Sequence, residues 1–149
     1  MAEDKTIKLS GKQIVDGLTT EKMRLETVQR NIASIQNLLQ EIFFAKESLK
    51  SIKKAKKGEN TIISLGAGIF LDMKISETTK VKRIIAGNIM LDSKADKALE
   101  ELEKQEKTTT EKLEELDRQQ QSIYANINTL SRILTQAQKA RQQETGKTD

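Results

Sequence analysis

The sequence predicts an α+β chain that is mainly helical: a long antiparallel coiled-coil hairpin around a central four-stranded antiparallel β region. Two long stretches repeat apolar residues in heptads, which is typical of helices that pack along a narrow seam. Between them lies the only stretch rich in β-branched residues and turn signals. We expect one domain over 1–149, with helices over about 12–55 and 94–142 and β hairpins over about 61–92.

The composition agrees with helices that bury a seam rather than a globular core. The 149 residues are 36% hydrophobic and 32% charged, with three Phe, one Tyr and no Trp. Proline is absent, so nothing in the sequence forces a helix to kink. The net charge is only +4, and this mild excess does not demand a nucleic-acid partner.

Cysteine and histidine are both absent from the chain. Their absence excludes disulfides and thiolate metal sites, and it removes the commonest general base and metal ligand. We therefore expect no enzymatic activity, no metal and no cofactor. No apolar run approaches the roughly 20 residues of a membrane span, and the first residues lack the apolar core of a secretory signal. We expect a soluble, cytoplasmic protein without a membrane partner.

The first helix is expected to begin just after Ser10, because Ser10 and Gln13 form a capping-box pattern. Apolar residues then recur in heptads that Glu21 and Lys46 interrupt. Gly58 is a natural stop signal. The heptad positions are Leu18, Leu25, Ile32 and Leu39, together with Ile14, Val28, Ile35, Ile42 and Leu49.

The β region is predicted to form two hairpins. Gly66-Ala67-Gly68 and Gly87-Asn88 are turn signals within apolar runs. Apolar and polar residues alternate most clearly along 69–75, which gives that strand one apolar face. Hairpins of this size cannot bury a core alone and leave unpaired strand edges, so we expect them to build an oligomer. The expected strands are 61–65, 69–75, 81–86 and 89–91.

The second helix is expected to begin after Ser93, which forms an S-x-x-D cap pattern with Asp96. Its heptads have polar breaks at Glu106, Thr109 and Gln120. The heptad positions are Leu99, Leu113, Ile127 and Leu134, together with Ala95, Leu102, Leu116, Ile123, Leu130 and Ala137.

The two helices are expected to pair antiparallel, in the register that sets Ile14 against Leu134 and Leu49 against Leu99. The middle of this coiled coil is predicted to be weaker, because the polar breaks of one helix oppose apolar residues of the other. The charges agree in outline with this arrangement. Lys50, Lys53 and Lys54 would lie near the β region on one helix, and Glu100, Glu101 and Glu103 on the other.

At the free end of this coiled coil, Val15 and Ile133 lie outside the paired seam. Few other parts of the chain could cover them, so they would form an exposed aliphatic patch suited to weak apolar contacts. The alternative is an ordinary coiled-coil core that frays at its end.

The sequence resembles the α class of prefoldin, an archaeal and eukaryotic co-chaperone also called GimC. The resemblance covers almost the whole chain and is most specific at Leu65–Leu71, LGAGIFL. Gly87 matches the glycine between the third and fourth strands. Two hairpins indicate the α class, because β-class subunits carry one. The family often has Pro where this chain has Ser64, which leaves a backbone N–H that Pro would lack.

The resemblance implies a hetero-hexamer of two α-class and four β-class chains, whose strands form a double β-barrel platform. It also implies an ATP-independent holdase whose coiled-coil tips bind unfolded proteins and deliver them to a group II chaperonin. The tip residues would be Ile14, Val15, Leu18, Leu130, Ile133 and Leu134. The platform residues would be Ile63, Leu65, Gly66, Gly68, Phe70, Gly87, Ile89 and Leu91.

Two other functions stay open. A chain of this fold could assemble with itself into filaments, as γ-class relatives do, if its barrel edge is self-complementary. A basic coiled coil that binds nucleic acid is the other alternative, but aromatic residues for base stacking are scarce and a solvated helix face explains the charges more simply. The basic cluster behind this alternative comprises Lys50, Lys53, Lys54, Lys56 and Lys57.

Overall fold

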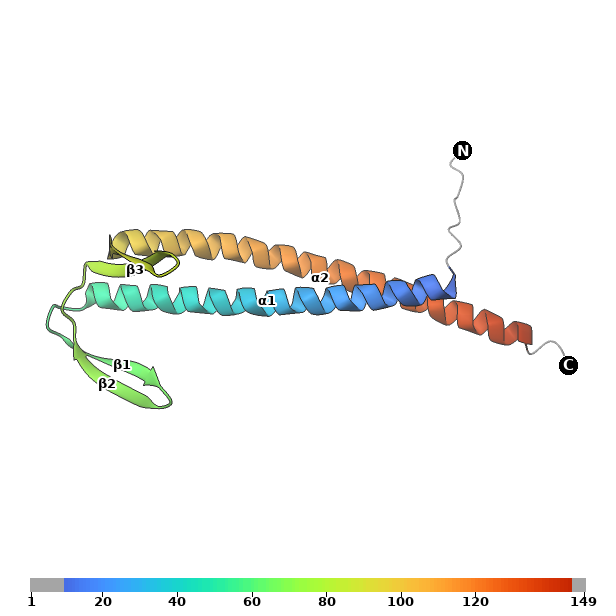
Figure 1. The fold of residues 1–149 in the computed structure, drawn as a ribbon, viewed down its shortest axis with the longest axis horizontal. Helices are drawn as coiled ribbons and strands as arrows, with labels where there is room; N and C mark the ends of the chain where they lie inside the picture. Colours follow the sequence, from blue (N-terminus) through green and yellow to red (C-terminus); the bar gives the residue numbers. More distant parts are fainter. Residues whose placement is uncertain (1–9, 146–149) are drawn as a thin grey trace, which may run out of the picture. The chain divides into compact units, whose positions relative to one another are not determined.

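The structure, a computed structural model, describes residues 10–145. Two units are described separately: unit 1 comprises Met1–Ser34 and Leu113–Asp149, and unit 2 comprises Ile35–Lys112. The prediction of a mainly helical α+β fold with two central β hairpins is confirmed (Figure 1). The elements are α1 (Gly11–Lys54), β1 (Asn60–Gly66), β2 (Ile69–Lys74), β3 (Lys80–Ala86), β4 (Ile89–Lys94) and α2 (Ala95–Thr145).

The start of α1 is fixed by the predicted capping box. The backbone N–H of Ser10 donates to Oε1 of Gln13 at 2.8 Å, and the N–H of Gln13 donates to Oγ of Ser10 at 3.3 Å. Each side chain thereby satisfies an amide that has no partner within the helix. The helix ends at Lys54, and Gly58 follows with a φ of 87°, a conformation that favours glycine.

In unit 1, α1 and α2 run side by side in opposite directions. A Cβ atom at Gly17 would lie 3.5 Å from Cδ1 of Leu130, so the two helices approach closely there. Further along, Nε2 of Gln29 donates a hydrogen bond to the hydroxyl of Tyr124 at 3.2 Å. The buried residues of this unit all occupy predicted heptad positions: Ile14, Val28, Ile32, Leu116 and Ile123.

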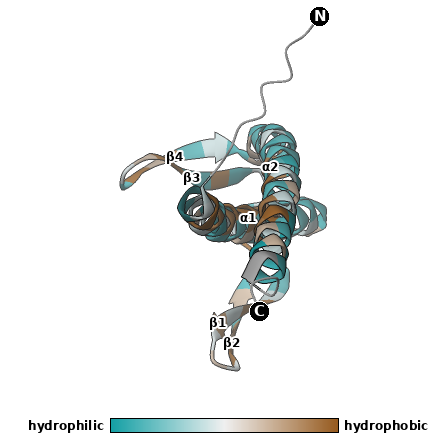
Figure 2. Ribbon diagram, turned by 90° about the vertical axis from the view of Figure 1, so that its right-hand side faces the viewer, coloured by the Kyte–Doolittle hydropathy of each residue, from teal (hydrophilic) through white to brown (hydrophobic). Residues whose placement is uncertain are grey.

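The seam between the helices in unit 2 is more polar. Ile42, Ala95 and Ala98 are buried, and Thr109 is a buried polar residue at a predicted break. Nζ of Lys46 lies 2.5 Å from Oε2 of Glu106 across the seam. The sequence placed Lys53 near glutamates of the second helix, but its partner in the structure is Asp96. Figure 2 shows apolar colour on the helices and also on the hairpins.

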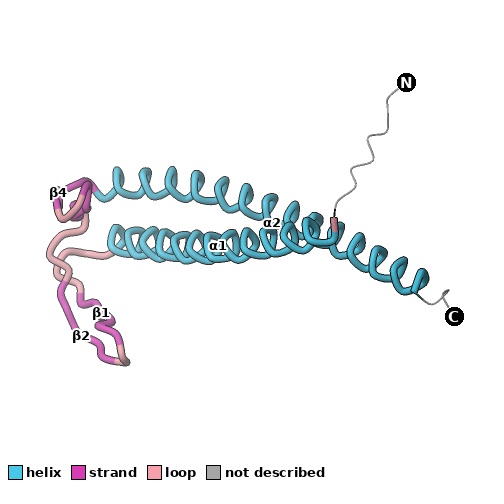
Figure 3. Tube along the Cα trace, turned by 45° about the vertical axis from the view of Figure 1, so that its right-hand side comes forward, coloured by secondary structure: helices cyan, strands magenta, loops and turns pink. Residues whose placement is uncertain are grey.

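The strands form two separate two-stranded sheets, coloured magenta in Figure 3. β1 pairs with β2 and β3 pairs with β4, both antiparallel. The register shifts between Ser64 and Gly66 in the first ladder and between Ile84 and Ala86 in the second. Each position of the second hairpin therefore corresponds to the position twenty residues earlier in the first. The two ladders share one register, whereas the turns differ, because Gly66, Ala67 and Gly68 all have positive φ in the first turn and only Gly87 does in the second.

The turn of the first hairpin is built from residues with positive φ. Gly66 has a φ of 94°, Ala67 of 51° and Gly68 of 78°. Positive φ at both central residues is the requirement of a type I′ turn, which matches the twist of the flanking strands. Gly87 has a φ of 56° in the turn of the second hairpin. The predicted turns are therefore confirmed at both positions.

The predicted helix cap at Ser93 is wrong. Ser93 belongs to β4 and pairs with Val81, and its hydroxyl donates to the carbonyl of Lys94 at 3.4 Å. The N–H of Ala95 instead donates to the carbonyl of Thr79 at 2.8 Å, so the β3 end of the ladder satisfies the first amide of α2. Strand β4 therefore continues into α2 without an intervening loop.

Candidate binding surfaces

Both hairpins expose large apolar side chains. No residue from 60 to 94 is buried, and the exposed fraction reaches 66% at Ile62 and 64% at Phe70 and Ile84. Apolar surface left in water costs about 25 cal/mol per Å² relative to covering it, so faces of this kind favour association. The exposed apolar residues of the hairpins are Ile62, Ile63, Leu65, Ile69, Phe70, Leu71, Met73, Ile84, Ile85, Ile89, Met90 and Leu91.

Strand pairing sorts these side chains onto faces. Ile63 lies opposite Leu71, and Ile84 lies opposite Met90. Directly opposite residues share a face of an antiparallel pair, so each hairpin carries an exposed apolar pair on one of its faces. The five apolar platform residues predicted from the sequence are all exposed on these strands. The three predicted glycines are in the turns, where they hold positive φ angles.

The predicted tip residues meet in unit 1, near the start of α1. A shallow pocket of about 400 Å³ there is lined by Ile14, Val15 and Leu134, among others. Val15 is 48% exposed and Ile133 is 37% exposed, whereas Ile14 is only 2% exposed. The accessible part of the predicted set is therefore centred on Val15 and Ile133, and Ile14 is packed in the seam. The remaining tip residues, Leu18, Leu130 and Leu134, are half-buried.

Hydrogen bonds to carboxylates hold the hairpins and the segment that joins them. Glu77 accepts from the hydroxyl of Thr79 at 2.7 Å, and from the N–H groups of Thr78 and Thr79 at 2.9 Å each. These bonds keep the pKa of Glu77 below its ordinary value, because they stabilise the ionised form. Nζ of Lys82 lies 2.9 Å from Oδ1 of Asp92, and this contact likewise lowers the pKa of Asp92.

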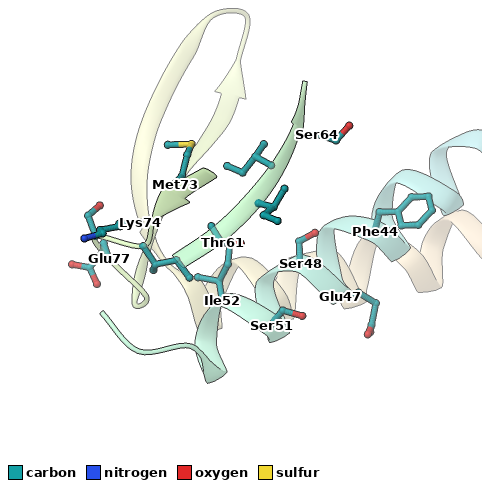
Figure 4. A pocket seen from close by; sticks show the side chains of 14 residues that line it. Phe44, Glu47, Ser48, Ser51, Ile52, Thr61, Ser64, Met73, Lys74 and Glu77 are labelled. Atoms are coloured by element: carbon teal, nitrogen blue, oxygen red, sulfur yellow. The ribbon is translucent and has the colours of Figure 1, made fainter. Parts of the chain in front are cut away.

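A groove that sequence reasoning missed lies in unit 2, between α1 and the β1–β2 hairpin (Figure 4). Its volume is about 710 Å³, and its apolar lining includes Phe44, Ile52, Ile63 and Met73. Phe44 is 58% exposed, and its ring meets that of Phe43 edge-on at a centroid distance of 5.8 Å. The sequence did carry one signal for this groove. Phe43 and Phe44 are adjacent aromatic residues outside the heptad positions, in a chain that has only three Phe.

These surfaces support binding through apolar contact. Among residues 10–145, no group of three or more His, Cys, Asp or Glu side chains is arranged to hold a metal ion. Neither of the two described helices is long and apolar enough to cross a membrane.

Comparison with known proteins gives a consistent family match. A family model described as "Prefoldin subunit" matches residues 22–140. Prefoldin subunit alpha of Thermofilum pendens (strain DSM 2475 / Hrk 5) is 30% identical over 79 residues. That match covers 53% of this chain and spans 61% of the relative's own length.

Two solved structures are similar in fold. Filamentous PFD from Methanocaldococcus jannaschii matches with a TM-score of 0.65 and 20% identity, over 77% of this chain and 95% of that chain. The prefoldin beta subunit from Thermococcus strain KS-1 matches with a TM-score of 0.57 and 18% identity, over 89% of this chain and 95% of that chain. At these identities the likeness shows a shared arrangement of helices and hairpins.

Proposed function

Because the chain belongs to the prefoldin family, a family of chaperone subunits, we propose that it is an ATP-independent holdase subunit. Its two hairpins and its match to a prefoldin alpha subunit support the α class. In this proposal the chain acts in the cytoplasm, without a cofactor, by binding other polypeptides.

Assembly through the hairpins is the first part of the proposal. The observation that carries it is the exposure of twelve large apolar side chains on two hairpins that contain no buried residue. Strands from several subunits would cover these faces and pair the free edges of each two-stranded sheet. We place two copies of this chain with four β-class subunits in a double β-barrel.

Client binding is the second part. Val15 and Ile133 offer exposed aliphatic surface close to the half-buried Leu134, and a non-native protein offers apolar surface in return. One such contact is weak, but several tethered tips raise the effective concentration of binding sites, and avidity adds about 100-fold or more. Weak individual contacts also permit release, which suits delivery of the client to a group II chaperonin.

A filament built from this chain alone is the second candidate. It is favoured by one observation, the fold similarity to a filamentous prefoldin. A heterologous contact between hairpins that does not close on itself would give an open chain of subunits. The same apolar faces serve both candidates, so only the stoichiometry separates them.

Native mass separates the two assemblies. The chain should be measured alone and after co-expression with a β-class prefoldin subunit. A discrete complex of two plus four chains supports the hexamer, and a ladder of the chain alone supports the filament. Phe70→Asp should abolish either assembly, because it replaces an exposed aromatic side chain with a charge, whereas Asp72→Asn on the same strand should not. A wild-type chain that stays monomeric in both samples contradicts assembly through the hairpins.

Client binding is tested by Val15→Ser with Ile133→Ser in one variant. We expect this variant to suppress aggregation of a denatured protein about tenfold less effectively, or worse. The effect is large because several tips bind one client together, so weakening every tip lowers the avidity of the whole complex. Its helix content and native mass should be unchanged. Met23→Ser is the matched control, because Met23 is also exposed in unit 1, at 64%. Equal activity of the tip variant and the control would contradict the role of the tips.

A further inference from the structure

Backbone hydrogen bonds join the ends of the helices and strands in unit 2. The N–H of Gly58 donates to the carbonyl of Ile75 at 2.7 Å, and the N–H of Ile75 donates to the carbonyl of Glu59 at 2.9 Å. Likewise, the N–H of Ala95 donates to the carbonyl of Thr79 at 2.8 Å. These bonds bring together three segments that we call the junction surface: 53–59, 74–80 and 94–97.

The junction surface concentrates the positive charge of the chain. Its three segments contain eight lysines and three carboxylates, an excess of five positive charges, whereas the whole chain has a net charge of +4. The rest of the chain is therefore nearly neutral, and an approaching charged molecule meets the strongest field here. All eight lysines are exposed. They are Lys53, Lys54, Lys56, Lys57, Lys74, Lys80, Lys94 and Lys97.

The three carboxylates of the junction surface already have partners. Asp96 forms an ion pair with Lys53, and Oε2 of Glu59 accepts from the N–H of Lys56 at 2.8 Å. Glu77 accepts the hydrogen bonds of the two threonines that follow it. Among residues 10–145, none of the other seven lysines forms an ion pair. Two ion pairs that lie outside the three segments add no net charge: Glu47–Lys50 and Lys82–Asp92.

Two of the unpaired lysines face each other. Lys80 lies directly opposite Lys94 in the β3–β4 ladder. Like charges at directly opposite positions destabilise an antiparallel pair. The corresponding pair of the first ladder is Asn60 and Lys74, so the shared register does not require two lysines. An anion bound between Lys80 and Lys94 would relieve their repulsion.

We propose that the junction surface binds an acidic, extended polypeptide segment of a partner protein. Acidic segments repel themselves and stay extended, so their carboxylates can reach lysines that lie on separate elements. Nucleic acid fits less well, because the three segments contain no aromatic residue for base stacking and no arginine for bidentate phosphate contacts. The only arginine between 35 and 112 is Arg83, which pairs with Glu101.

This interaction goes beyond the proposed function and uses other residues. None of the eight lysines belongs to the tip or platform residues predicted from the sequence. Loss of the junction surface should therefore leave the native mass of the assembly and the holding of denatured proteins unchanged. Both measurements accompany every variant below.

Binding is measured by fluorescence anisotropy with the full chain, in the assembly that it forms, and a labelled oligo-glutamate peptide. One variant combines Lys57→Gln, Lys80→Gln and Lys94→Gln. It should bind the peptide about tenfold more weakly, because several small contributions from exposed charge pairs are lost together. Added salt should weaken binding to the wild-type chain more than binding to this variant, since fewer charges remain to be screened.

The matched control combines Lys104→Gln, Lys107→Gln and Lys112→Gln, which removes the same charge from exposed positions of α2. It should weaken binding by less than about twofold, because these lysines lie outside the proposed contact. Equal losses in the two variants would overturn the inference, since binding would then follow net charge alone. Absence of peptide binding to the wild-type chain at physiological salt would also overturn it.

A single-stranded oligonucleotide of the same charge tests the class of partner. If it binds more tightly than the peptide and loses affinity in the junction variant, the choice of an acidic polypeptide is wrong. In each of these cases the proposed function stands if native mass and client holding are unchanged.

Carbodiimide coupling to the wild-type chain gives a second measurement that needs no variant. The reagent activates a glutamate carboxyl of the peptide, and a lysine amine then displaces the activating group to form an amide. Mass spectrometry should locate these amides at Lys57, Lys80 and Lys94. Amides found as often at Lys104 and Lys107 would contradict a specific junction surface.

Discussion

Lys46 and Glu106 form an ion pair across the seam between α1 and α2, with Nζ 2.5 Å from Oε2. Each residue interrupts the heptads of its own helix, and the predicted register set Glu106 against the apolar Ile42 in a weak middle region. The structure brings two polar breaks together in one layer, where the Lys46 side chain is 13% exposed and that of Glu106 is 36% exposed. A buried charge is tolerated when its partner is present.

Removing one partner of this pair should cost more than removing both. Glu106→Gln should lower the free energy of unfolding by about 1–2 kcal/mol, because the Lys46 ammonium stays largely buried without a full counter-charge. The partial exposure of Glu106 to solvent keeps this loss of stability small. Lys46→Met combined with Glu106→Leu should recover most of that stability. Urea unfolding followed by helix content measures both. A double-mutant cycle without coupling between the two positions would refute the proposed layer.

Gly17→Ala should stabilise the chain. A Cβ at this position meets Cδ1 of Leu130 at 3.5 Å, which is ordinary van der Waals contact, and alanine gains up to about 1 kcal/mol over glycine in a helix interior. Gly11→Ala is the control, because Gly11 begins the helix and has nothing within 4 Å, so it should gain less. Thermal melting compares the two variants. A lower melting temperature for Gly17→Ala would mean that Leu130 needs the space.

Acid should loosen the segment between the two hairpins through Glu77. Its folded-state pKa lies below the ordinary value of 4.5, so its hydrogen bonds stabilise the fold fully above that value and are lost as the pH falls through the folded-state pKa. The amide signals of Thr78 and Thr79 should therefore shift together with the Glu77 carboxyl signal in an NMR titration. Glu77→Gln should remove this step. A Glu77 titration at or above 4.5 would disprove the assignment.

The heptads carried most of what the sequence could predict. Ile42, Leu116 and Ile123 are buried because a repeating apolar pattern fixes which side of a helix faces its partner. The turns at Gly66 and Gly87 were predictable for a similar reason, since positive φ restricts the residues that fit. Both signals are local and are read from a few neighbouring residues.

The errors and omissions concern contacts between distant segments. Ser93 carries a valid local cap pattern, but the ladder with β3 extends to Lys94 and the carbonyl of Thr79 satisfies the first helix amide. The partner of Lys53 depends on where a long side chain meets α2, and heptad spacing does not define this. The groove beside Phe44 requires the hairpin and the helix together, so no stretch of sequence encodes it alone.

The matching ladders make the β region modular. Removing residues 64–83 would join Ile63 directly to Ile84. Asn60 would then lie opposite Lys94, and Ile63 opposite Leu91. Both pairs keep the register that the two parent ladders already use. Duplication of one hairpin in a shorter ancestor, or loss of one from a longer chain, therefore needs no change in either helix. A single in-phase insertion or deletion is enough to convert a one-hairpin chain into a two-hairpin chain, or the reverse.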